Sequence, residues 1–391
     1  MPLETAWSGQ ADDAVAFAGA YGTLRNRLGG DPGFVVAAFN EKRDARALRD
    51  AVSLLPEGVR VLGLRTCRGI LTEEGPHLTG PVLGLLGLSP DAGRFGIGMR
   101  TFGPDPRSAS SQALLSALDD AGRPGELPDL ILIAVSAGSE ERVLAGIADV
   151  LGQTVPLCGG SAYGDGAVLS RHTALPDAVA VAVAFIATPV SQAFQAGCIP
   201  LGRSGVVTRV EGRRRIVAID GRPAARVYAE WFAASAGRAL PAGDAAVPAA
   251  VPYPLGRRID SRDGMSSYRV SALAEISEAG LLAMTDIAPG DRVMMMTAVP
   301  EDMLVRSGRI AAAAIAMQHA DSGKFTGALV TICAGLQGRI VSRLPRSHSA
   351  LTAAMQGRPF LAIFTNGEQG CPFERGAVHS NLMVGVLTFG V

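Results

Sequence analysis

The sequence lacks an excess of charge of either sign. Lys plus Arg and Asp plus Glu are both 36 of 391 residues, so the formal net charge at pH 7 is +0. Because nucleic-acid-binding proteins need positive charge to neutralise phosphates, this balance argues against a DNA or RNA partner. Charged residues are 18% of the chain, below the average of about 25%. We therefore expect a largely uncharged surface and a homo-oligomer.

Long apolar runs are also missing. The strongest run, "AVAVAVAFIA" at 178–187, is about half the length of a membrane-spanning helix. It predicts a buried strand, and we expect no membrane insertion. Residues 1–10 lack a basic region followed by an apolar core, so we expect no signal peptide and a cytoplasmic location.

Signatures of metal and disulfide chemistry are absent. The five cysteines are widely scattered, with no C-x-x-C pair, which is typical of reduced, structural thiols. The five histidines include no pair at metal-ligand spacing, and H-E-x-x-H does not occur, so a conventional zinc site is not expected. Aromatic residues are only 5% of the chain and leave few rings to stack on a haem.

The first half of the chain has the pattern of a mixed α/β protein. A helical pattern at 11–28 precedes an apolar strand, "GFVVAAF", a helix at 44–55 that stops before Pro56, and a second strand, "VRVLGLRT". Further strands are predicted at "PVLGLLGL", "FGIGMRTF", "DLILIAVS" and "TVPLCG", with helices near 107–121 and 140–151.

The pattern changes after residue 177. Consecutive apolar runs with Gly- or Pro-containing turns predict an antiparallel meander over about 177–221. A helix at 221–235 follows, and the Ala- and Pro-rich segment 239–256 is the best candidate for a linker. Strands, a long helix at 301–319, a strand at 327–335, a helix at 347–356 and two final strands then repeat the pattern of the first half.

The stretch "VPLCGGSAYGD" at 155–165 follows a short apolar run and predicts a turn at Gly159, Gly160 and Ser161. Glycine reaches positive φ without steric cost, so such a turn can aim backbone N–H groups at an anion or a carbonyl. The stretch matches neither a Walker A loop nor G-x-S-x-G. The alternative is a structural turn in which Asp165 accepts backbone N–H bonds.

Two further segments carry polar residues at predicted strand ends. The stretch "FTNGEQGCPFERGAVHSN" places Glu368, Gln369, His379 and Asn381 between two apolar strands, which indicates either a pocket wall or a solvated hairpin. The stretch "TICAGLQGR" ends a buried strand and leads to Arg339. This arginine can bind a carboxylate or phosphate with two parallel hydrogen bonds, or pair with an acidic neighbour.

Taken together, several segments resemble the FIST family, which supplies sensory domains to bacterial and eukaryotic signalling proteins. The resemblance spans about residues 30–391 and is carried by "TVPLCGGSAYGD", "IVAIDGRPAARVYAEWF", "ICAGLQGR", and "TNGEQG" followed by His379. Family members tend to place His and Asn side by side near the end, whereas this chain has His379-Ser380-Asn381.

The resemblance implies a FIST N-like domain at 30–225, a FIST C-like domain at 226–391 and a helical extension at 1–29. The fold class expected is α/β (mixed α+β), with two modules that each contain a mixed sheet and flanking helices. It also implies an input domain for a small, amino-acid-like ligand. Because no kinase, cyclase or methyl-accepting segment follows Val391, we expect the signal to pass to a separate downstream protein.

The first hypothesis is a ligand-binding sensory protein with a pocket between its halves and no cofactor. The expected ligand-binding residues are Gly159, Gly160, Ser161, Asp165, Arg339, Glu368, Gln369, His379 and Asn381.

Two alternatives stay open. One is an enzyme that hydrolyses or opens a small cyclic or carbonyl substrate, with Ser161 or Cys158 as nucleophile and Glu368 or His379 as base. The other, suggested by family members that resemble haem-based nitric-oxide sensors, is a haem protein with His379 as axial ligand.

Overall fold

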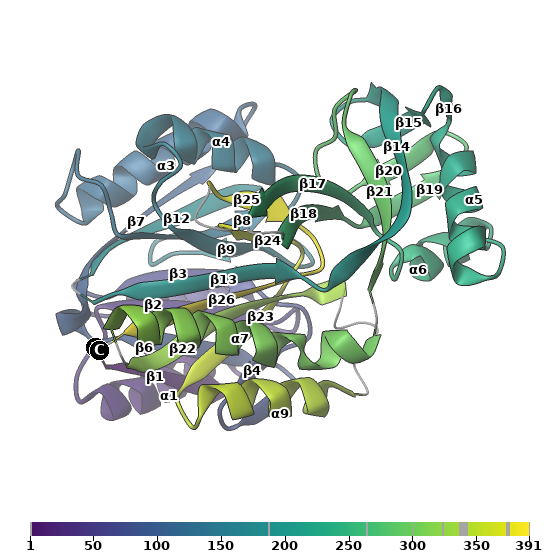
Figure 1. Cartoon of the computed structure of the whole chain (residues 1–391). Coiled ribbons are helices and arrows are strands. Elements are labelled where there is room, and N and C mark those ends of the chain that lie inside the picture. The colour runs from purple at the N-terminus through teal and green to yellow at the C-terminus, as the bar shows by residue number, and fades with distance from the viewer. Residues whose placement is uncertain are drawn as a thin grey trace. The chain divides into compact units, whose positions relative to one another are not determined.

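The computed structural model describes residues 2–186, 188–262, 265–298, 300–322, 324–335, 343–372 and 376–390. The chain forms two compact units. Unit 1 comprises residues 1–194, 304–378 and 384–391, and unit 2 comprises residues 195–303 and 379–383. Both units contain helices and strands (Figure 1), so the predicted mixed class, α/β (mixed α+β), is confirmed.

Unit 1 contains the same β-α-β arrangement three times. In each repeat a helix connects two parallel strands, which are hydrogen-bonded to each other. Repeat 1 is β2 (Phe34–Phe39), α2 (Ala45–Ser53) and β3 (Arg60–Arg65); repeat 2 is β8 (Leu130–Ser136), α4 (Glu140–Leu151) and β9 (Leu157–Ala162); repeat 3 is β22 (Phe325–Cys333), α9 (Leu344–Met355) and β23 (Phe360–Thr365).

A closing strand completes each repeat on the other side of its first strand. The three closing strands are antiparallel to β2, β8 and β22 respectively, and they are β6 (Leu83–Leu88), β12 (Ala178–Ile186) and β26 (Met383–Gly390). The sheets extend further through β1 (Leu3–Ser8) beside β6, β7 (Gly93–Thr101) beside β12, and β13 (Val190–Ala196) beside β26.

The repeats are interlocked by short strands that follow the last strand of each one. β4 (Ile70–Thr72) follows β3 but pairs with β23, β10 (Val168–Leu169) follows β9 but pairs with β3, and β24 (Glu368–Gly370) follows β23 but pairs with β9. β5 (Gly75–His77) forms a hairpin with β4, and β11 (Ala174–Leu175) forms one with β10. β25 (Val378–Ser380) comes after β24. Each repeat therefore donates a strand to another repeat.

One hydrophobic core fills the space between the three sheets of unit 1. It draws on β2, β3, β8, β9, β12, β22, β23 and β26, and it includes many small side chains such as those of Ala180 and Ala182. The outer faces are covered by helices. α1 (Asp13–Leu28) and α2 pack on one sheet, and α3 (Pro106–Asp120) and α4 pack on the second. α7 (Pro300–Ser322) and α9 lie along the sheet of β22 and β23 (Figure 1).

Local sequence explains where these helices begin. The side chains of Asp12, Asp44 and Asp105 accept hydrogen bonds from backbone N–H groups in the first turns of α1, α2 and α3. These bonds satisfy donors that a helix leaves unpaired at its start. The structure contains the helices predicted at 11–28, 44–55, 107–121 and 140–151, so these predictions are confirmed. Residues 3–8 add a strand to the N-terminal segment.

Unit 2 is built on a single antiparallel sheet with two helices. Its core includes Tyr228 and Phe232 of α5 (Ala224–Ala236) and Ala250 of α6 (Ala246–Ala250). Its strands are β14 (Cys198–Glu211), β15 (Arg215–Ile219), β16 (Arg222–Pro223), β17 (Leu255–Arg262), β18 (Met265–Ser271), β19 (Leu273–Ser277), β20 (Gly280–Ala283) and β21 (Arg292–Ala298).

Two sequence-based expectations are wrong. The predicted meander after residue 177 does not form, because β12, β13 and β14 enter three different sheets and only β14 pairs with its successor. The predicted linker at 239–256 belongs to unit 2, since Ala250 and Leu255 are buried in its core. Within the described ranges, the helices are all too short or too polar to cross a lipid bilayer.

Close packing of α3 on β7 gives a testable expectation. A Cβ atom at Gly96 would lie 2.1 Å from the carbonyl oxygen of Ala117, so backbone must move to admit it. We expect Gly96→Ala to lower the free energy of unfolding by about 1–3 kcal/mol, measured by urea denaturation. Gly22→Ala in α1 meets nothing within 4 Å and should instead raise it by roughly 0.5–1 kcal/mol. Equal effects would contradict this packing.

Candidate ligand site at the converging strand ends

The last strands of the three repeats meet end to end in unit 1. Three backbone hydrogen bonds connect them: Tyr163 N to Arg65 O (2.9 Å), Asn366 N to Ser161 O (2.8 Å) and Cys67 N to Phe364 O (2.9 Å). We call this arrangement the strand-end ring. Ligand sites of α/β proteins commonly lie at the carboxyl ends of their strands, because loops from several strands converge there. The ring is therefore the candidate functional site.

Gly159 and Gly160 reach this site as part of a strand. Both lie in β9, between β8 and β24, and the predicted turn with exposed N–H groups is wrong. A Cβ atom at Gly159 would lie 2.2 Å from the carbonyl oxygen of Ile133, and one at Gly160 would lie 2.2 Å from a side-chain carbon of Thr365. Glycine is required here for packing, against partners far away in the sequence.

Ser161 is the centre of a buried polar network in unit 1. Its Oγ donates a hydrogen bond to Oε1 of Glu140 (2.9 Å) and accepts one from Nε2 of Gln369 (3.1 Å). All three residues are at most 1% exposed. Glu140 is the first residue of α4, where the partial positive charge of the helix N-terminus stabilises a carboxylate. Ser161 and Gln369 were expected from the sequence, but Glu140 was not. Nothing in the local sequence shows that the first turn of α4 lies against Ser161 of β9.

Glu368 brings a second buried carboxylate to the same strands. Its Oε1 accepts a hydrogen bond from the hydroxyl of Thr365 (2.7 Å), and both residues are 0% exposed. In β24, Glu368 stands opposite Gly160 and Gln369 opposite Gly159. The alternative of a solvated hairpin is therefore wrong for Glu368 and Gln369.

Asp165 forms an ion pair beside the ring. Its carboxylate accepts two hydrogen bonds from the guanidinium of Arg65 (2.6 and 3.0 Å) and one from Ala167 N (3.1 Å). The side chain of Arg65 is only 7% exposed, whereas that of Asp165 is 58% exposed. Arg65 also donates to the carbonyl oxygens of Asn40 and Arg43. Asp165 thus holds an arginine that connects β3 to the loop after β2.

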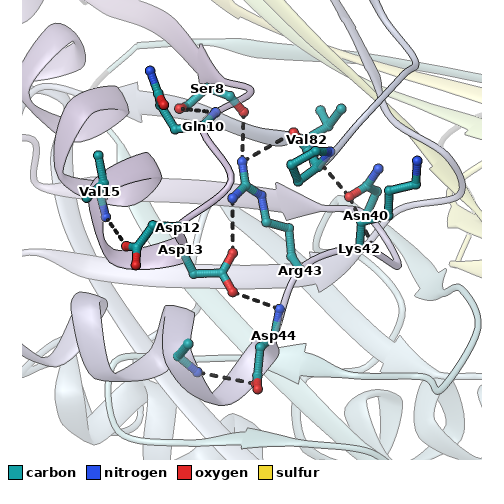
Figure 2. A network of polar contacts seen from close by, with 12 residues as sticks. Ser8, Gln10, Asp12, Asp13, Val15, Asn40, Lys42, Arg43, Asp44 and Val82 are labelled. Carbon is teal, nitrogen blue, oxygen red and sulfur yellow. Dashed lines mark hydrogen bonds and ion pairs between the residues drawn. The ribbon is translucent and has the colours of Figure 1, made fainter.

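That loop is fixed by a second buried arginine (Figure 2). The guanidinium of Arg43 donates to Asp13 (3.0 Å) and to the carbonyl oxygen of Ser8 (3.1 Å), and Asp13 also accepts from Asp44 N. The side-chain oxygen of Asn40 accepts from Val82 N (3.0 Å). The loop that borders the strand-end ring is therefore rigidly positioned.

The outer rim of the ring carries a thiol, a phenol and two charges. The Cys67 sulfur and the Tyr163 hydroxyl are hydrogen-bonded; burial raises the pKa of Cys67, and Cys67 raises the pKa of Tyr163. The exposed Arg68 donates its backbone N–H to the carboxylate of the exposed Glu41 (3.1 Å). Arg68 has φ of 61°, a left-handed conformation that is uncommon outside glycine and often occurs at functional sites.

Comparison with protein families identifies two domains in the chain. The FIST N domain matches residues 33–222 and the FIST C domain matches residues 224–371. The chain belongs to the FIST family. Domains of this family are sensory, ligand-binding modules. No curated protein sequence matches this FIST chain.

Solved structures resemble the chain only distantly. Cyanuric acid hydrolase from A. caulinodans is 9% identical with a TM-score of 0.39, and the alignment covers 100% of this chain and 99% of that one. PurLQS from Thermotoga maritima is 12% identical with a TM-score of 0.25, covering 77% and 75%.

The other residues expected to bind the ligand belong to unit 2 or fall outside the described residues. Arg339 falls in 336–342, outside the described ranges. Asn381 belongs to unit 2, where its side-chain oxygen accepts from Ala272 N (3.1 Å). His379 also belongs to unit 2 and is 1% exposed; its Nε2 lies 3.3 Å from the carbonyl oxygen of Met284. A metal-bound histidine commonly gives its other ring nitrogen to a carbonyl oxygen, so the haem hypothesis stays a prediction.

The ion pair between Arg65 and Asp165 gives a second testable expectation. We expect Asp165→Asn to lower the free energy of unfolding of this FIST protein by about 1–2 kcal/mol, because a nearly buried guanidinium loses its counter-charge. Glu126→Gln, which breaks the surface pair with Arg123 (side chains 52% and 41% exposed), should change it by less than about 0.5 kcal/mol. Urea denaturation measures the free energy of unfolding of both variants. Equal losses in the two variants would refute the expectation.

Proposed function

We propose that this FIST protein is a sensory module that binds a small polar, amino-acid-like molecule at the strand-end ring of unit 1. The observation that carries the proposal is the network of Ser161, Glu140 and Gln369, which are buried together where three strands end. Burying polar groups costs free energy, and apolar side chains of similar size often fill such a space at lower cost. A buried polar network at strand ends is therefore better explained by recognition than by stability.

The charges of the site indicate which end of the ligand lies where. Glu140 and Glu368 supply carboxylate oxygens, which accept hydrogen bonds, so the ligand end near them is a donor such as an amine or amide. The exposed rim offers Arg68, and Arg339 follows the carboxyl end of β22 in the sequence. In this proposal these arginines receive the anionic end of the ligand. Asp165 keeps a positioning role through Arg65.

The proposal also covers how the bound state is transmitted, in which form the chain works and where it is located. The signal passes to a separate downstream protein, and the chain works as a homo-oligomer in the cytoplasm.

Two serine variants test the proposal. We expect some members of a panel of free amino acids, amines and small amides to raise the thermal midpoint of the wild-type protein. Ser161→Ala should bind the same compounds at least tenfold more weakly, because the network loses the hydroxyl that joins Glu140 to Gln369. Thermal shift and isothermal titration measure these effects.

Ser110→Ala is the matched control. Ser110 is 0% exposed, and within the described ranges its hydroxyl bonds to the carbonyl oxygens of Arg107 and Val143 alone. Both variants should lose stability of roughly 1–3 kcal/mol, but only Ser161→Ala should lose the ligand response. The proposal fails if both variants keep it.

The hydrogen bond from Ser161 to Glu140 favours a second candidate, an enzyme acting on a small cyclic or carbonyl compound. A serine donating to a carboxylate at 2.9 Å is arranged as a nucleophile beside a base. Cys158 is a poor alternative nucleophile, because complete burial raises its pKa to about 12 and keeps the thiol protonated. Turnover of such a compound by wild type but not by Ser161→Ala would favour the enzyme; turnover that survives the substitution would remove it.

A further inference from the structure

Unit 1 contains a cavity at the other end of β3 from the strand-end ring. Its volume is about 470 Å³, within the usual range for sites that hold small molecules. It lies between the start of β3, the middle of β7, the last turns of α3 and the turn that connects β10 to β11. None of its lining residues belongs to the site proposed above.

The cavity has an excess of positive charge. Arg60, Arg100 and Arg171 line it, against two carboxylates, those of Glu57 and Asp120. Asp120 is already paired with Arg60 through a hydrogen bond of 2.6 Å. Arg100, Arg171 and Glu57 remain, so a bound molecule would meet a net positive charge.

Arg100 and Arg171 are held in place by uncharged acceptors. Arg100 donates to the hydroxyl of Ser116 (2.7 Å) and to the carbonyl oxygen of Met99 (2.8 Å). Arg171 donates to backbone carbonyl oxygens at the end of α2, among them that of Ser53. In the part of the chain that the structure describes, no carboxylate pairs with either guanidinium. Both side chains are thus positioned while their charge is not neutralised.

The rest of the wall suits a small organic anion. Ile97 and Met99 provide apolar surface, and the hydroxyls of Ser170 and Thr173 lie at the turn between β10 and β11. Guanidinium groups bind carboxylates and phosphates with paired, charge-assisted hydrogen bonds. Because the surrounding groups combine this charge with apolar contact, an anion that also carries carbon fits the cavity better than a free ion.

We propose that this cavity is a second ligand site, which binds a small organic anion bearing a carboxylate or a phosphate through Arg100 and Arg171. The site is independent of the ligand at the strand-end ring, since the two share no residue.

Isothermal titration of the full chain tests the proposal with two probes, succinate and glycerol 3-phosphate. Wild type should bind at least one of them saturably, and the affinity should fall as salt is added. Which probe binds more tightly identifies the carboxylate or the phosphate as the natural group. Arg100→Gln should weaken that binding at least tenfold.

Arg94→Gln is the matched control, because Arg94 lies on the same strand and is exposed but does not line the cavity. It should bind as wild type does, and so should Ser161→Ala, which separates this site from the strand-end ring. A second variant, Arg171→Gln, should weaken binding while the thermal midpoint shows that the protein is folded. Absence of saturable binding to wild type, or equal affinity in Arg100→Gln and Arg94→Gln, would overturn the proposal.

Discussion

Three backbone hydrogen bonds at the ends of β3, β9 and β23 are the interaction on which unit 1 depends. Each joins an amide just beyond one strand to a carbonyl in another repeat, at 2.8–2.9 Å. The exchanged strands β4, β10 and β24 continue these contacts along the same three strands. A buried amide without a partner costs free energy, so no repeat can leave the ring without cost to the other two. The ring therefore fixes Ser161, Glu140 and Gln369 in one place.

This interlocking explains why the compact units and the family domains divide the chain differently. The FIST N and FIST C matches meet between residues 222 and 224. Unit 1 combines two repeats from the first match with residues 304–378, which form the third repeat. Unit 2 is inserted between them in sequence. The division at residue 225 stays a prediction about the two family domains. The compact units have other boundaries, because the strand-end ring joins the third repeat to the first two.

Local patterns in the sequence predicted most of the helices and strands, because capping residues, apolar periodicity and Pro56 act within a few residues of each other. They failed where a segment depends on a distant partner. The adjacent Gly159 and Gly160 indicate a turn, since glycine is common in turns, but contacts with Ile133 and Thr365 require glycine in a strand. Similarly, β12 pairs with β7 and β8 rather than with its successor.

The residues of the candidate site could likewise be predicted only where they depend on local sequence. Ser161, Glu368 and Gln369 could be chosen from sequence because they are polar residues at the edges of apolar runs. Glu140 and Thr365 could not, since their roles follow from strand pairing. The pairing of β9 with β8 brings Ser161 to Glu140, and the pairing of β9 with β24, more than 200 positions further along the chain, brings Gly160 against Thr365. No short motif records that pairing. The ring of hydrogen bonds is likewise invisible in the sequence, because backbone groups are the same in every residue.

Hydrogen exchange of the full chain, with and without the compound that stabilises it most, shows whether the ligand binds at the strand-end ring. If the ligand binds at the strand-end ring, slower exchange should be concentrated in the amides of residues 65–69, 138–140, 160–163 and 365–369. These segments are far apart in sequence but adjoin the same ring. Protection confined to unit 2, with no change in these four segments, would show that the ligand does not bind at the ring.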